Sequence, residues 1–357
     1  MSPANAPPAL PTPPLWTDPQ RERAFQHWLT GLAGAQGLDA NSVRLASADA
    51  SFRRYLRIDS TAGSRIIMDA PPLKEDCRPF VKVAQLMLWA GLLAPQVLAW
   101  DEPNGFMLLS DLGTQTMMQA IDPAQPLANL GLYRHAVDAL VAWQTASKPD
   151  VLPPYDHPLL KRELGLFPEW YLGQHRGLTL DAAQQTTLHT AFATIMTQNL
   201  SAPSVYVHRD FMPRNLMVAG DRLGVLDFQD AVYGPITYDV ASLMRDAFLS
   251  WDEDFCLDIT VRYWERARRA GLPVGDDFGE FYRGVEWMGL QRHLKVAGIF
   301  ARLTLRDGKP QYLADTPRFM AYIRATCGRY RELKPLLRLL DQLEGVTAAN
   351  GYAFGRV

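Results

Sequence analysis

Apolar residues at helical spacing predict an N-terminal helix over residues 19–37. Short segments of alternating or β-branched apolar residues follow, and a second helix is predicted to begin at its cap residue Asp76 and to run through Trp89. The strand-like segments occupy residues 42–46, 52–58, 65–68, 97–100 and 105–109. The first 112 residues therefore predict a small sheet with a helix packed on it.

The rest of the chain has a helical pattern, which strand-like segments interrupt only at residues 205–228. The helix-like segments occupy residues 128–147, 160–172, 182–200, 237–248, 253–270, 278–303 and 317–343. This order predicts an α+β protein with a β-rich N-lobe over residues 16–112 and a larger, mainly helical C-lobe over residues 113–357. Residues 1–15 are rich in Pro and Ala and are predicted to be a disordered tail.

The composition is that of an ordinary globular protein. Lys and Arg total 36, Asp and Glu total 38, and the resulting net charge of −2 argues against a nucleic-acid-binding protein. The scattered cysteines, Cys77, Cys256 and Cys327, argue against a disulfide framework or a structural zinc site. No apolar run approaches the roughly 20 residues of a membrane helix, and residues 1–14 lack the pattern of a signal peptide. We expect a cytoplasmic monomer that does not bind membranes.

The most informative chemistry lies in the interruption of the helical pattern. Residues 208–215 read H-R-D-x-x-x-x-N, and a D-F pair follows at Asp227. Phosphoryl transfer depends mainly on positioning and charge neutralisation, so it needs a carboxylate that orients the attacking hydroxyl and oxygen ligands for Mg²⁺. Asp210 fits the first role as the catalytic residue, and Asn215 and Asp227 fit the second as metal ligands.

The residues between these positions predict how they are arranged. Residues 216–218 and 223–226 have the pattern of a hairpin, which would bring Asn215 and Asp227 to one end of the same ribbon. His208 is expected to hydrogen-bond the backbone of the loop and to take no part in proton transfer.

The motif resembles that of the aminoglycoside phosphotransferase/choline kinase branch of the protein-kinase-like fold. The matching residues are His208, Asp210, Asn215, Asp227 and the Tyr238-Asp239 pair that opens a helix. The resemblance implies a bilobal protein-kinase-like fold, ATP as the phosphoryl donor and Mg²⁺ as the cofactor. Asp239 is expected to brace the catalytic loop by accepting bonds from backbone N–H groups.

Longer segments resemble a narrower family, the bacterial anomeric amino-sugar kinases of cell-wall recycling that act on N-acetylmuramate and N-acetylglucosamine. These segments are residues 51–55, 68–72, 75–80, 226–235 and 291–295. The resemblance implies ATP-dependent phosphorylation of the C1 hydroxyl of N-acetylmuramic acid or N-acetylglucosamine, which yields the α-1-phosphate for peptidoglycan recycling.

The N-lobe departs from the usual kinase pattern. Kinases hold the α- and β-phosphates with a Lys on the third strand, but residues 65–68 contain no Lys, and no G-x-G-x-x-G loop precedes them. Arg53, Arg54 and Lys74 are alternative sources of the missing cation. The predicted nucleotide-binding residues are Ser51, Arg53 and Arg54, the hinge residues Ser110, Asp111 and Leu112, and the adenine-contacting residues Met217 and Leu226.

The candidate sugar-binding residues come from several segments. Aromatic faces stack on sugar rings and carboxylates accept sugar hydroxyls, which points to Trp170 and Glu163, with ordinary helix packing as the alternative. Arg292 and Lys295 share a helix face and suit the lactyl carboxylate of muramic acid, with a solvated face as the alternative. The remaining candidates are Arg214 in the catalytic loop and Tyr233 after the metal-binding Asp.

Three other functions remain as alternatives to the anomeric kinase. The same fold could phosphorylate another alcohol, such as an aminoglycoside, choline or homoserine. A protein kinase is disfavoured because no A-P-E sequence follows Asp227 and the next helix begins near Asp239. A nucleotide-binding pseudokinase is disfavoured because Asp210, Asn215 and Asp227 are all present.

Overall fold

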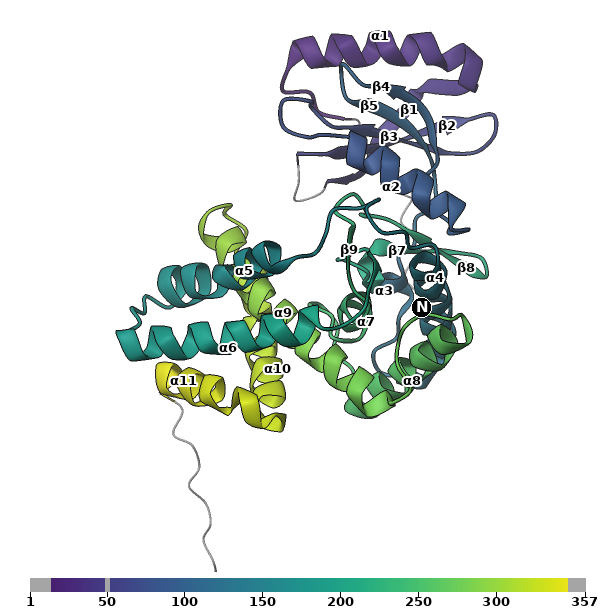
Figure 1. Ribbon diagram of the computed structural model, residues 1–357. Coiled ribbons are helices and arrows are strands. Elements are labelled where there is room, and N and C mark those ends of the chain that lie inside the picture. Colours follow the sequence, from purple (N-terminus) through teal and green to yellow (C-terminus); the bar gives the residue numbers. More distant parts are fainter. Residues whose placement is uncertain (1–13, 49–51, 346–357) are drawn as a thin grey trace, which may run out of the picture. The chain divides into compact units, whose positions relative to one another are not determined.

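The computed structural model describes residues 14–48 and 52–345. The predicted disordered tail, residues 1–15, lies almost wholly outside the described residues, and the predicted nucleotide contact Ser51 also lies outside them. A β-sheet forms in the N-terminal part of the chain and helices dominate the C-terminal part, which confirms the predicted α+β class (Figure 1).

The chain divides into two compact units. The first unit comprises the residues up to Ala120 together with Arg214–Asp230, and the second comprises Ile121–Pro213 and the residues from Ala231 onward. The segment that carries both predicted metal ligands therefore belongs to the first unit, whereas the sequence-based division at residue 112 assigns it to the C-lobe.

The first unit is built on a five-stranded antiparallel sheet with the order β1-β2-β3-β5-β4. The strands are β1 (Leu38–Ala48), β2 (Arg54–Ser60), β3 (Arg65–Asp69), β4 (Val97–Asp101) and β5 (Phe106–Ser110). Strand β1 begins earlier than predicted because Leu38 and Asp39 also pair with β2, before an irregularity that ends at Arg44. Each of the other four strands overlaps its predicted segment.

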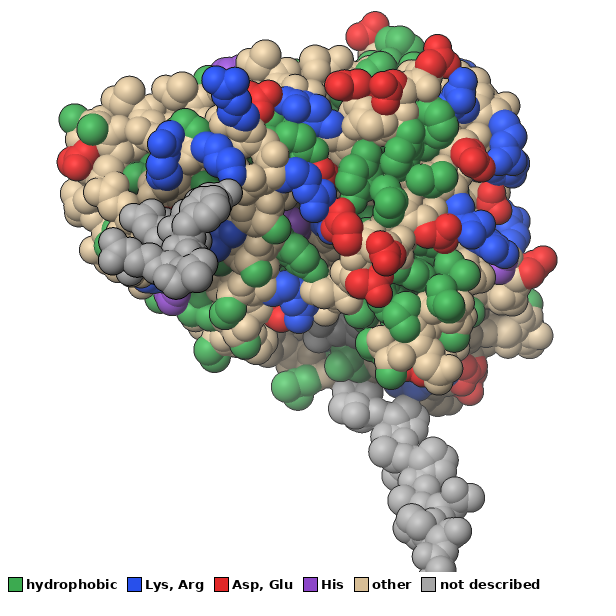
Figure 2. Space-filling model, turned by 90° about the horizontal axis from the view of Figure 1, so that it is seen from below, with side chains coloured by type: hydrophobic (Ala, Val, Ile, Leu, Met, Phe, Trp, Pro, Cys, Tyr) green, Lys and Arg blue, Asp and Glu red, His purple; other side chains and the backbone are tan. Residues whose placement is uncertain are grey.

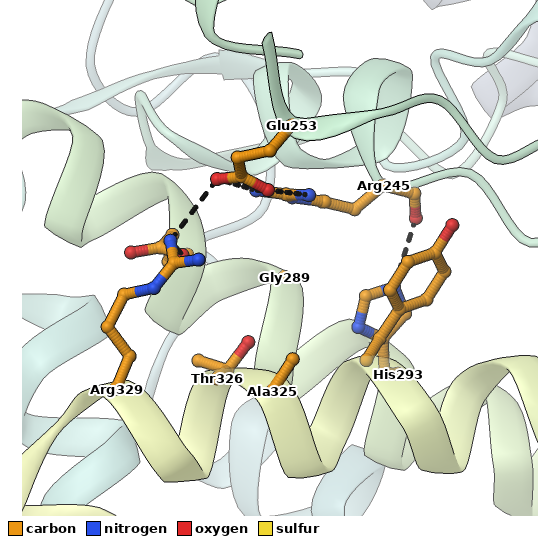
Figure 3. Close-up of a pocket in the computed structure, with 9 residues that line it drawn as sticks. Arg245, Glu253, Gly289, His293, Ala325, Thr326 and Arg329 are labelled. Carbon is orange, nitrogen blue, oxygen red and sulfur yellow. Dashed lines mark hydrogen bonds and ion pairs between the residues drawn. The ribbon is translucent and has the colours of Figure 1, made fainter.

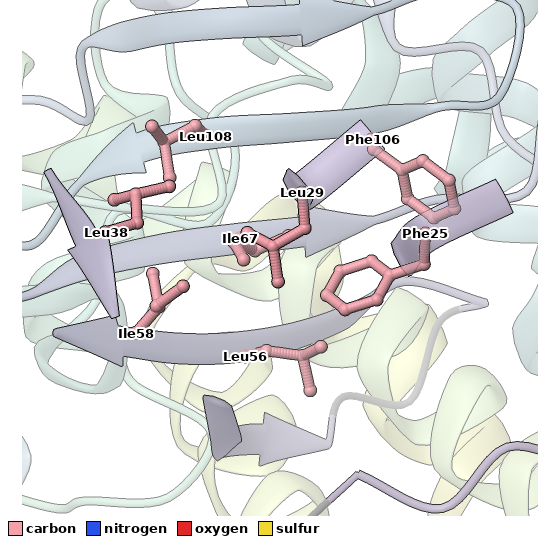
Figure 4. Packing of buried hydrophobic residues seen from close by; sticks show 8 residues of the cluster. All are labelled: Phe25, Leu29, Leu38, Leu56, Ile58, Ile67, Phe106 and Leu108. Carbon is pink, nitrogen blue, oxygen red and sulfur yellow. The ribbon is translucent and has the colours of Figure 1, made fainter. Parts of the chain in front are cut away.

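Helix α1 (Pro19–Gln36) covers one face of this sheet, and helix α2 (Arg78–Trp89) lies on the other face (Figure 1). Phe25 and Leu29 of α1 are buried against Leu56, Ile67 and Phe106 of the sheet (Figure 4). Each such side chain contributes roughly 1.5–3 kcal/mol when it is fully buried. A shift of one residue along a strand would turn its side chains to the other face of the sheet, so the burial of these residues fixes the register.

Helix α2 joins the sheet to the D-F segment. The Phe80 ring of α2 lies 4.9 Å from the ring of Phe228, and both side chains are buried. The predicted cap of this helix needs a correction: the N-cap residue is Cys77, which makes no side-chain cap bond. The Asp76 carboxylate still accepts a hydrogen bond from the Arg78 backbone N–H at 3.0 Å, so the predicted cap residue is wrong by one position.

The hairpin is formed by β7 (Leu216–Ala219) and β8 (Arg222–Val225), which confirms the prediction for this segment. It is attached to the rest of the first unit by backbone bonds. The Val218 N–H donates to the Gln115 carbonyl at 2.9 Å, shortly before α3 (Met117–Ala120), and the Val225 N–H donates to the Leu93 carbonyl at 2.8 Å. The end of the hairpin is therefore fixed within the first unit.

The second unit is helical apart from a short antiparallel pair, β6 (Ser204–Val207) and β9 (Val232–Pro235). Its helices are α4 (Leu130–Thr145), α5 (His157–Leu166), α6 (Ala182–Leu200), α7 (Tyr238–Met244), α8 (Glu253–Arg269), α9 (Phe278–Leu305), α10 (Thr316–Arg329) and α11 (Lys334–Glu344). Helix α9 contacts α5, α6, α7 and α10, so polar residues on α9 are placed inside the unit.

Two predicted helices are interrupted. The segment predicted as one helix over residues 160–172 is α5 followed by a π-helical segment, Phe167–His175, because Pro168 lacks the N–H that the α-helical pattern requires. The segment predicted as one helix over residues 317–343 is split between α10 and α11. Pro335 likewise cannot donate to the carbonyl four residues earlier, and the chain at Tyr330 is extended (φ −106°, ψ 129°).

The surface agrees with the balanced composition. Basic and acidic side chains are interspersed with hydrophobic ones on the face seen in Figure 2. Within residues 14–48 and 52–345, no helix is long and apolar enough to cross a membrane.

Candidate active site

The catalytic loop follows β6 in the second unit, and Asp239 holds its backbone. The Asp239 carboxylate accepts hydrogen bonds from the His208 N–H at 2.7 Å and from the Arg209 N–H at 3.0 Å. The Asp210 N–H donates to Nδ1 of the buried His208 ring at 3.2 Å. The predictions that His208 bonds to loop backbone and that Asp239 braces the loop are therefore confirmed.

Asp239 is fully buried in this role. Burial raises the pKa of its carboxyl to about 6, although His208 and the two backbone N–H donors act in the opposite direction. Because this pKa lies below neutral pH, the Asp239 carboxyl is charged there, and its two oxygens accept hydrogen bonds from the two loop N–H groups.

Asp210 combines a fixed backbone with an accessible side chain. Its side chain is 38% exposed, while the neighbouring Arg292 side chain is only 6% exposed. The Arg292 Nη2 atom lies 4.0 Å from the Asp210 Oδ1 atom. The candidate catalytic carboxylate thus faces both solvent and a buried cation.

The first unit brings the two candidate metal ligands together. Asn215 Nδ2 lies 3.4 Å from Asp227 Oδ2, and Gln229 Nε2 donates to Asp227 Oδ1 at 2.8 Å. The Leu226 N–H donates to the Asn215 carbonyl at 2.9 Å, which closes this end of the hairpin. Asp227 has φ 61°, a left-handed conformation that is uncommon for non-glycine residues and is often found at functional sites.

This donor set fits Mg²⁺. The metal prefers carboxylate and amide oxygens, and it is usually held by one or two protein groups together with phosphates and waters. Gln229 Oε1, beside Asp227, is a further buried oxygen without a hydrogen-bond partner among the described residues. No group of three or more His, Cys, Asp or Glu side chains in the described parts of the chain forms a metal cage.

The candidate phosphate-binding cations of the first unit have different environments. Arg54 Nε and Nη2 both donate to Asp69 Oδ2, at 3.1 and 2.6 Å, and Arg21 donates to the other oxygen of the same carboxylate. Arg53 forms an ion pair with Glu75 at 3.1 Å. The Lys74 ammonium lies over the Phe52 ring, 4.5 Å from its centroid. Arg54 is therefore committed to the sheet, whereas Arg53 and Lys74 belong to the loops beside it.

The predicted hinge is rigid for a reason that the sequence did not reveal. Arg57 makes a bidentate pair with Asp111, at 2.6 and 3.1 Å, and also donates to the Gly113 carbonyl at 2.8 Å. Ser110 exchanges bonds with Gln96, whose N–H donates to the Ser110 hydroxyl oxygen at 2.8 Å. Arg57 lies on β2 and Asp111 directly follows β5, so the two residues are far apart in the sequence and no local pattern indicates the pair.

The predicted hinge residue Leu112 and the predicted adenine contact Met217 both lie near Gly224 on β8. A Cβ atom at this glycine would lie 2.8 Å from Leu112 Cδ1 and 3.4 Å from Met217 Cβ. Met217 is buried and Leu226 is half-buried. Leu112 and Met217 are therefore brought together within the first unit.

The predicted sugar-binding residues differ in exposure. Glu163 is buried and accepts four donors: Arg209 Nη2 at 2.6 Å, Lys295 Nζ at 2.9 Å, the Tyr155 hydroxyl at 2.5 Å and Gln291 Nε2 at 2.9 Å. Lys295 is buried too, and it also donates to the Tyr238 hydroxyl at 3.2 Å. The α9 face that carries Lys295 and Arg292 is therefore not a solvated one.

The remaining three candidates are more accessible. Arg214 is exposed, and Trp170 and Tyr233 are half-buried. The backbone of Tyr233 exchanges bonds with the segment before α5, where its N–H donates to the Pro153 carbonyl at 2.7 Å. The roles of these three residues stay predictions.

A separate cavity in the second unit is lined by charged side chains that pair with one another (Figure 3). Arg245 at the end of α7 makes a bidentate pair with Glu253 of α8 at 3.0 Å, and Arg329 of α10 pairs with both Glu253 and Glu286 of α9. The space accessible to the centres of water molecules is about 30 Å³, which suffices for about two waters. We interpret this cluster as a link between helices.

Comparison with known proteins places this geometry in a family. A model described as "Phosphotransferase enzyme family" matches residues 42–274. The chain is 48% identical over 328 residues to the N-acetylmuramate/N-acetylglucosamine kinase of Neisseria meningitidis serogroup B, covering 91% of this chain and 97% of that protein.

Solved structures with low sequence identity share the fold. A choline/ethanolamine kinase family protein from Mesorhizobium loti matches with a TM-score of 0.61 at 14% identity, covering 90% of this chain and 99% of that one. An amicoumacin kinase in complex with AMP-PNP and Ca²⁺ matches with a TM-score of 0.57 at 14% identity, covering 86% and 96%. At this identity the likeness shows the fold alone.

Proposed function

The chain belongs to the phosphotransferase enzyme family, and we propose that it is a kinase that transfers the γ-phosphoryl group of ATP to the C1 hydroxyl of N-acetylmuramic acid and N-acetylglucosamine. The observation that carries this proposal is the 48% identity to the Neisseria meningitidis kinase across 97% of that protein. The braced catalytic loop around Asp210 supports an active enzyme over a pseudokinase.

In the proposed reaction, the sugar O1 attacks the γ-phosphorus of ATP. The new O1–P bond forms while the bond to the β,γ-bridging oxygen breaks, so that ADP leaves. Asp210 orients the C1 hydroxyl and receives its proton, which then passes to solvent. The products are ADP and the α-1-phosphate of the sugar.

Asn215 and Asp227 are the proposed magnesium ligands, and Gln229 orients the Asp227 carboxylate through its 2.8 Å bond. When bound, the metal neutralises negative charge on the phosphates. The left-handed backbone at Asp227 presents the carboxylate at the end of the hairpin. Leu112, Met217 and Leu226 are the proposed contacts of adenine, and the backbone of Ser110 and Asp111 is the proposed hinge.

The position of the phosphorylated hydroxyl gives the direct test. Incubation with ATP, Mg²⁺ and N-acetylglucosamine or N-acetylmuramic acid is expected to give a sugar phosphate whose ³¹P signal couples to the anomeric proton. The methyl α-glycoside of N-acetylglucosamine is the matched control, because its C1 oxygen is blocked and no product should form. Coupling to the C6 protons, or phosphorylation of the glycoside, would reject the anomeric assignment.

We propose that Arg53 replaces the missing strand lysine. In protein kinases the phosphate-binding Lys is itself paired with a Glu of a nearby helix, and Arg53 is paired with Glu75, shortly before α2. A charge-assisted hydrogen bond contributes roughly 1.5–3 kcal/mol. Arg53→Met is therefore expected to raise the KM for ATP by about 10- to 100-fold.

Lys74→Met is the matched control for this prediction, since Lys74 lies in the same loop region but interacts with the Phe52 ring. Steady-state kinetics with ATP as the varied substrate distinguish the two cations. A larger effect of Lys74→Met than of Arg53→Met would assign the phosphate contact to Lys74.

A further inference from the structure

We propose that Arg292 is a positioning residue for Asp210, supported by Glu163, and that it serves both amino sugars alike instead of recognising the lactyl carboxylate of muramic acid. This inference rests on the proposed function for its substrates. It replaces the initial interpretation of Arg292 and Lys295 as a cationic pair for that carboxylate.

The peptide group that joins Arg209 to Asp210 is held on both sides. Arg292 Nη1 donates to the Arg209 carbonyl oxygen at 2.5 Å, and the N–H on the other side of the same peptide donates to His208 Nδ1 at 3.2 Å. Both polar atoms of this peptide are therefore held by side chains. The direction in which the Asp210 side chain leaves the backbone depends on the orientation of that peptide.

The backbone of the catalytic loop is strained at Arg209. Arg209 has φ 77°, and a left-handed conformation costs a non-glycine residue roughly 1–2 kcal/mol. Such a conformation persists only when the surrounding structure determines it. Asp239 holds the Arg209 N–H, Arg292 holds its carbonyl and Glu163 holds its side chain, so three elements determine this residue.

Glu163 of α5 is a buried carboxylate that stays charged. Burial alone would raise its pKa, but Lys295 and Arg209 together lower the pKa of this carboxyl to about 2, so it remains charged at neutral pH. Its two oxygens are fully used by the four donors described above. Glu163 therefore anchors the Arg209 side chain permanently, and Lys295 supplies the second positive charge that keeps the carboxylate ionised.

The charges of this cluster balance only when Asp210 is included. The buried Arg292 and Lys295 and the half-buried Arg209 exceed the buried anions Glu163 and Asp239 by one positive charge. The Asp210 carboxylate, 4.0 Å from Arg292, supplies the third anion. The cluster is therefore balanced by the candidate catalytic carboxylate, and a substrate carboxylate at Arg292 would compete with it.

Arg292 and Lys295 are both buried. The Arg292 side chain is 6% exposed, and its guanidinium lies 4.8 Å from the centroid of the Tyr238 ring. Lys295 makes its contacts with Glu163 and Tyr238 in the same interior. Both cations have partners inside the second unit, as expected for groups that hold a loop, and the buried Arg292 Nε atom has no hydrogen-bond partner among the described residues.

The two proposed substrates provide the test, because they differ by the lactyl ether. The lysine in Arg292→Lys keeps the positive charge. It lacks the planar set of donors with which the guanidinium bonds the Arg209 carbonyl and faces Asp210. A displacement of about 1 Å costs on the order of 100-fold in rate. We expect kcat to fall by about 10- to 100-fold by the same factor for both sugars, with little change in either KM. A selective rise in the KM for N-acetylmuramic acid would overturn the proposal.

A second variant tests the support from Glu163. Glu163→Gln removes the charge that anchors Arg209, and we expect equal losses of kcat for both sugars together with faster amide hydrogen exchange in residues 205–212. Arg266→Gln, which breaks the exposed pair with Asp138, is the matched control and should change neither quantity. Unchanged exchange in both Glu163→Gln and Arg292→Lys would contradict the positioning role.

These readouts separate the two proposals. If the unmodified protein phosphorylates neither sugar, the proposed function fails, while the exchange measurement still tests whether Glu163 and Arg292 hold the loop. If the unmodified protein is active and the variants keep full kcat with both sugars, only the inference about positioning fails.

Discussion

Asp210→Asn is expected to lower kcat by about 10²- to 10⁴-fold, the range typical for the loss of a positioned proton acceptor. Asparagine has nearly the same shape, and its backbone N–H can still donate to His208. The amide, however, cannot receive the proton of the sugar hydroxyl. The loss should therefore fall on turnover, with little change in the affinity for ATP.

Single-turnover kinetics and calorimetric titration with ATP and Mg²⁺ would measure the two effects separately. Asp138→Asn, an exposed residue of the second unit, is the matched control because it also removes one carboxylate. The variant should remain folded, since the Asp210 side chain is 38% exposed. A kcat of Asp210→Asn within threefold of the unmodified protein would remove Asp210 from the mechanism.

The sequence alone predicted those features that depend on residues close together in the chain. The hairpin β7–β8 was predicted from two short apolar segments around a turn, because register and turn are specified within ten or so residues. The brace by Asp239 was predicted through a family motif, and its two backbone contacts are confirmed. The division into a β-rich part and a helical part followed from hydrophobic periodicity.

The buried cluster around Asp210 could not be predicted, because its members come from distant segments. Glu163 lies on α5, Arg209 in the catalytic loop and Lys295 on α9. Each looks like a surface or ligand-binding residue in its own segment, and only tertiary contact shows that the charges balance. The same holds for Arg57 and Asp111, which meet across the sheet.

The two interrupted helices show a second limit of prediction from the sequence, which concerns hydrophobic periodicity. Hydrophobic periodicity continues through Pro168 and Pro335, and it therefore predicts one helix where the backbone forms two segments. The missing N–H of proline decides the hydrogen-bond pattern locally, although the apolar face continues. At Pro168 the result is a π-helical segment next to α5, the helix that carries Glu163.

The cluster also bears on the missing lysine of the first unit. The proposed catalytic groups depend on two kinds of support: a fixed set of buried ion pairs around Asp210, and the donor set at the hairpin end around Asp227. Arg53 and Glu75 form a further ion pair, in the first unit. Arg209 is held by Asp239, Glu163 and Arg292, which all belong to this chain. The catalytic loop therefore needs no phosphorylated residue to keep Arg209 in place.

Asp227→Asn is expected to lower kcat/KM for ATP by about 10²- to 10³-fold at a fixed, subsaturating concentration of Mg²⁺, since metal ions contribute several kcal/mol of charge stabilisation in such reactions. Asparagine tolerates the left-handed backbone that this position requires (φ 61°), so the substitution removes a charge with little strain. The Gln229 amide then faces a neutral partner where it now donates to a carboxylate.

Titration of activity with Mg²⁺ and with Mn²⁺ gives the measurement. The half-saturating Mg²⁺ concentration should rise in Asp227→Asn, and Mn²⁺, which takes the same carboxylate and carbonyl oxygen ligands, serves as a second probe of the same site. Asp221→Asn, at the exposed turn of the same hairpin, is the matched control. An unchanged Mg²⁺ dependence in Asp227→Asn would show that the metal is held elsewhere, and the pairing of Asn215 with Asp227 at the end of the hairpin would then have only a structural role.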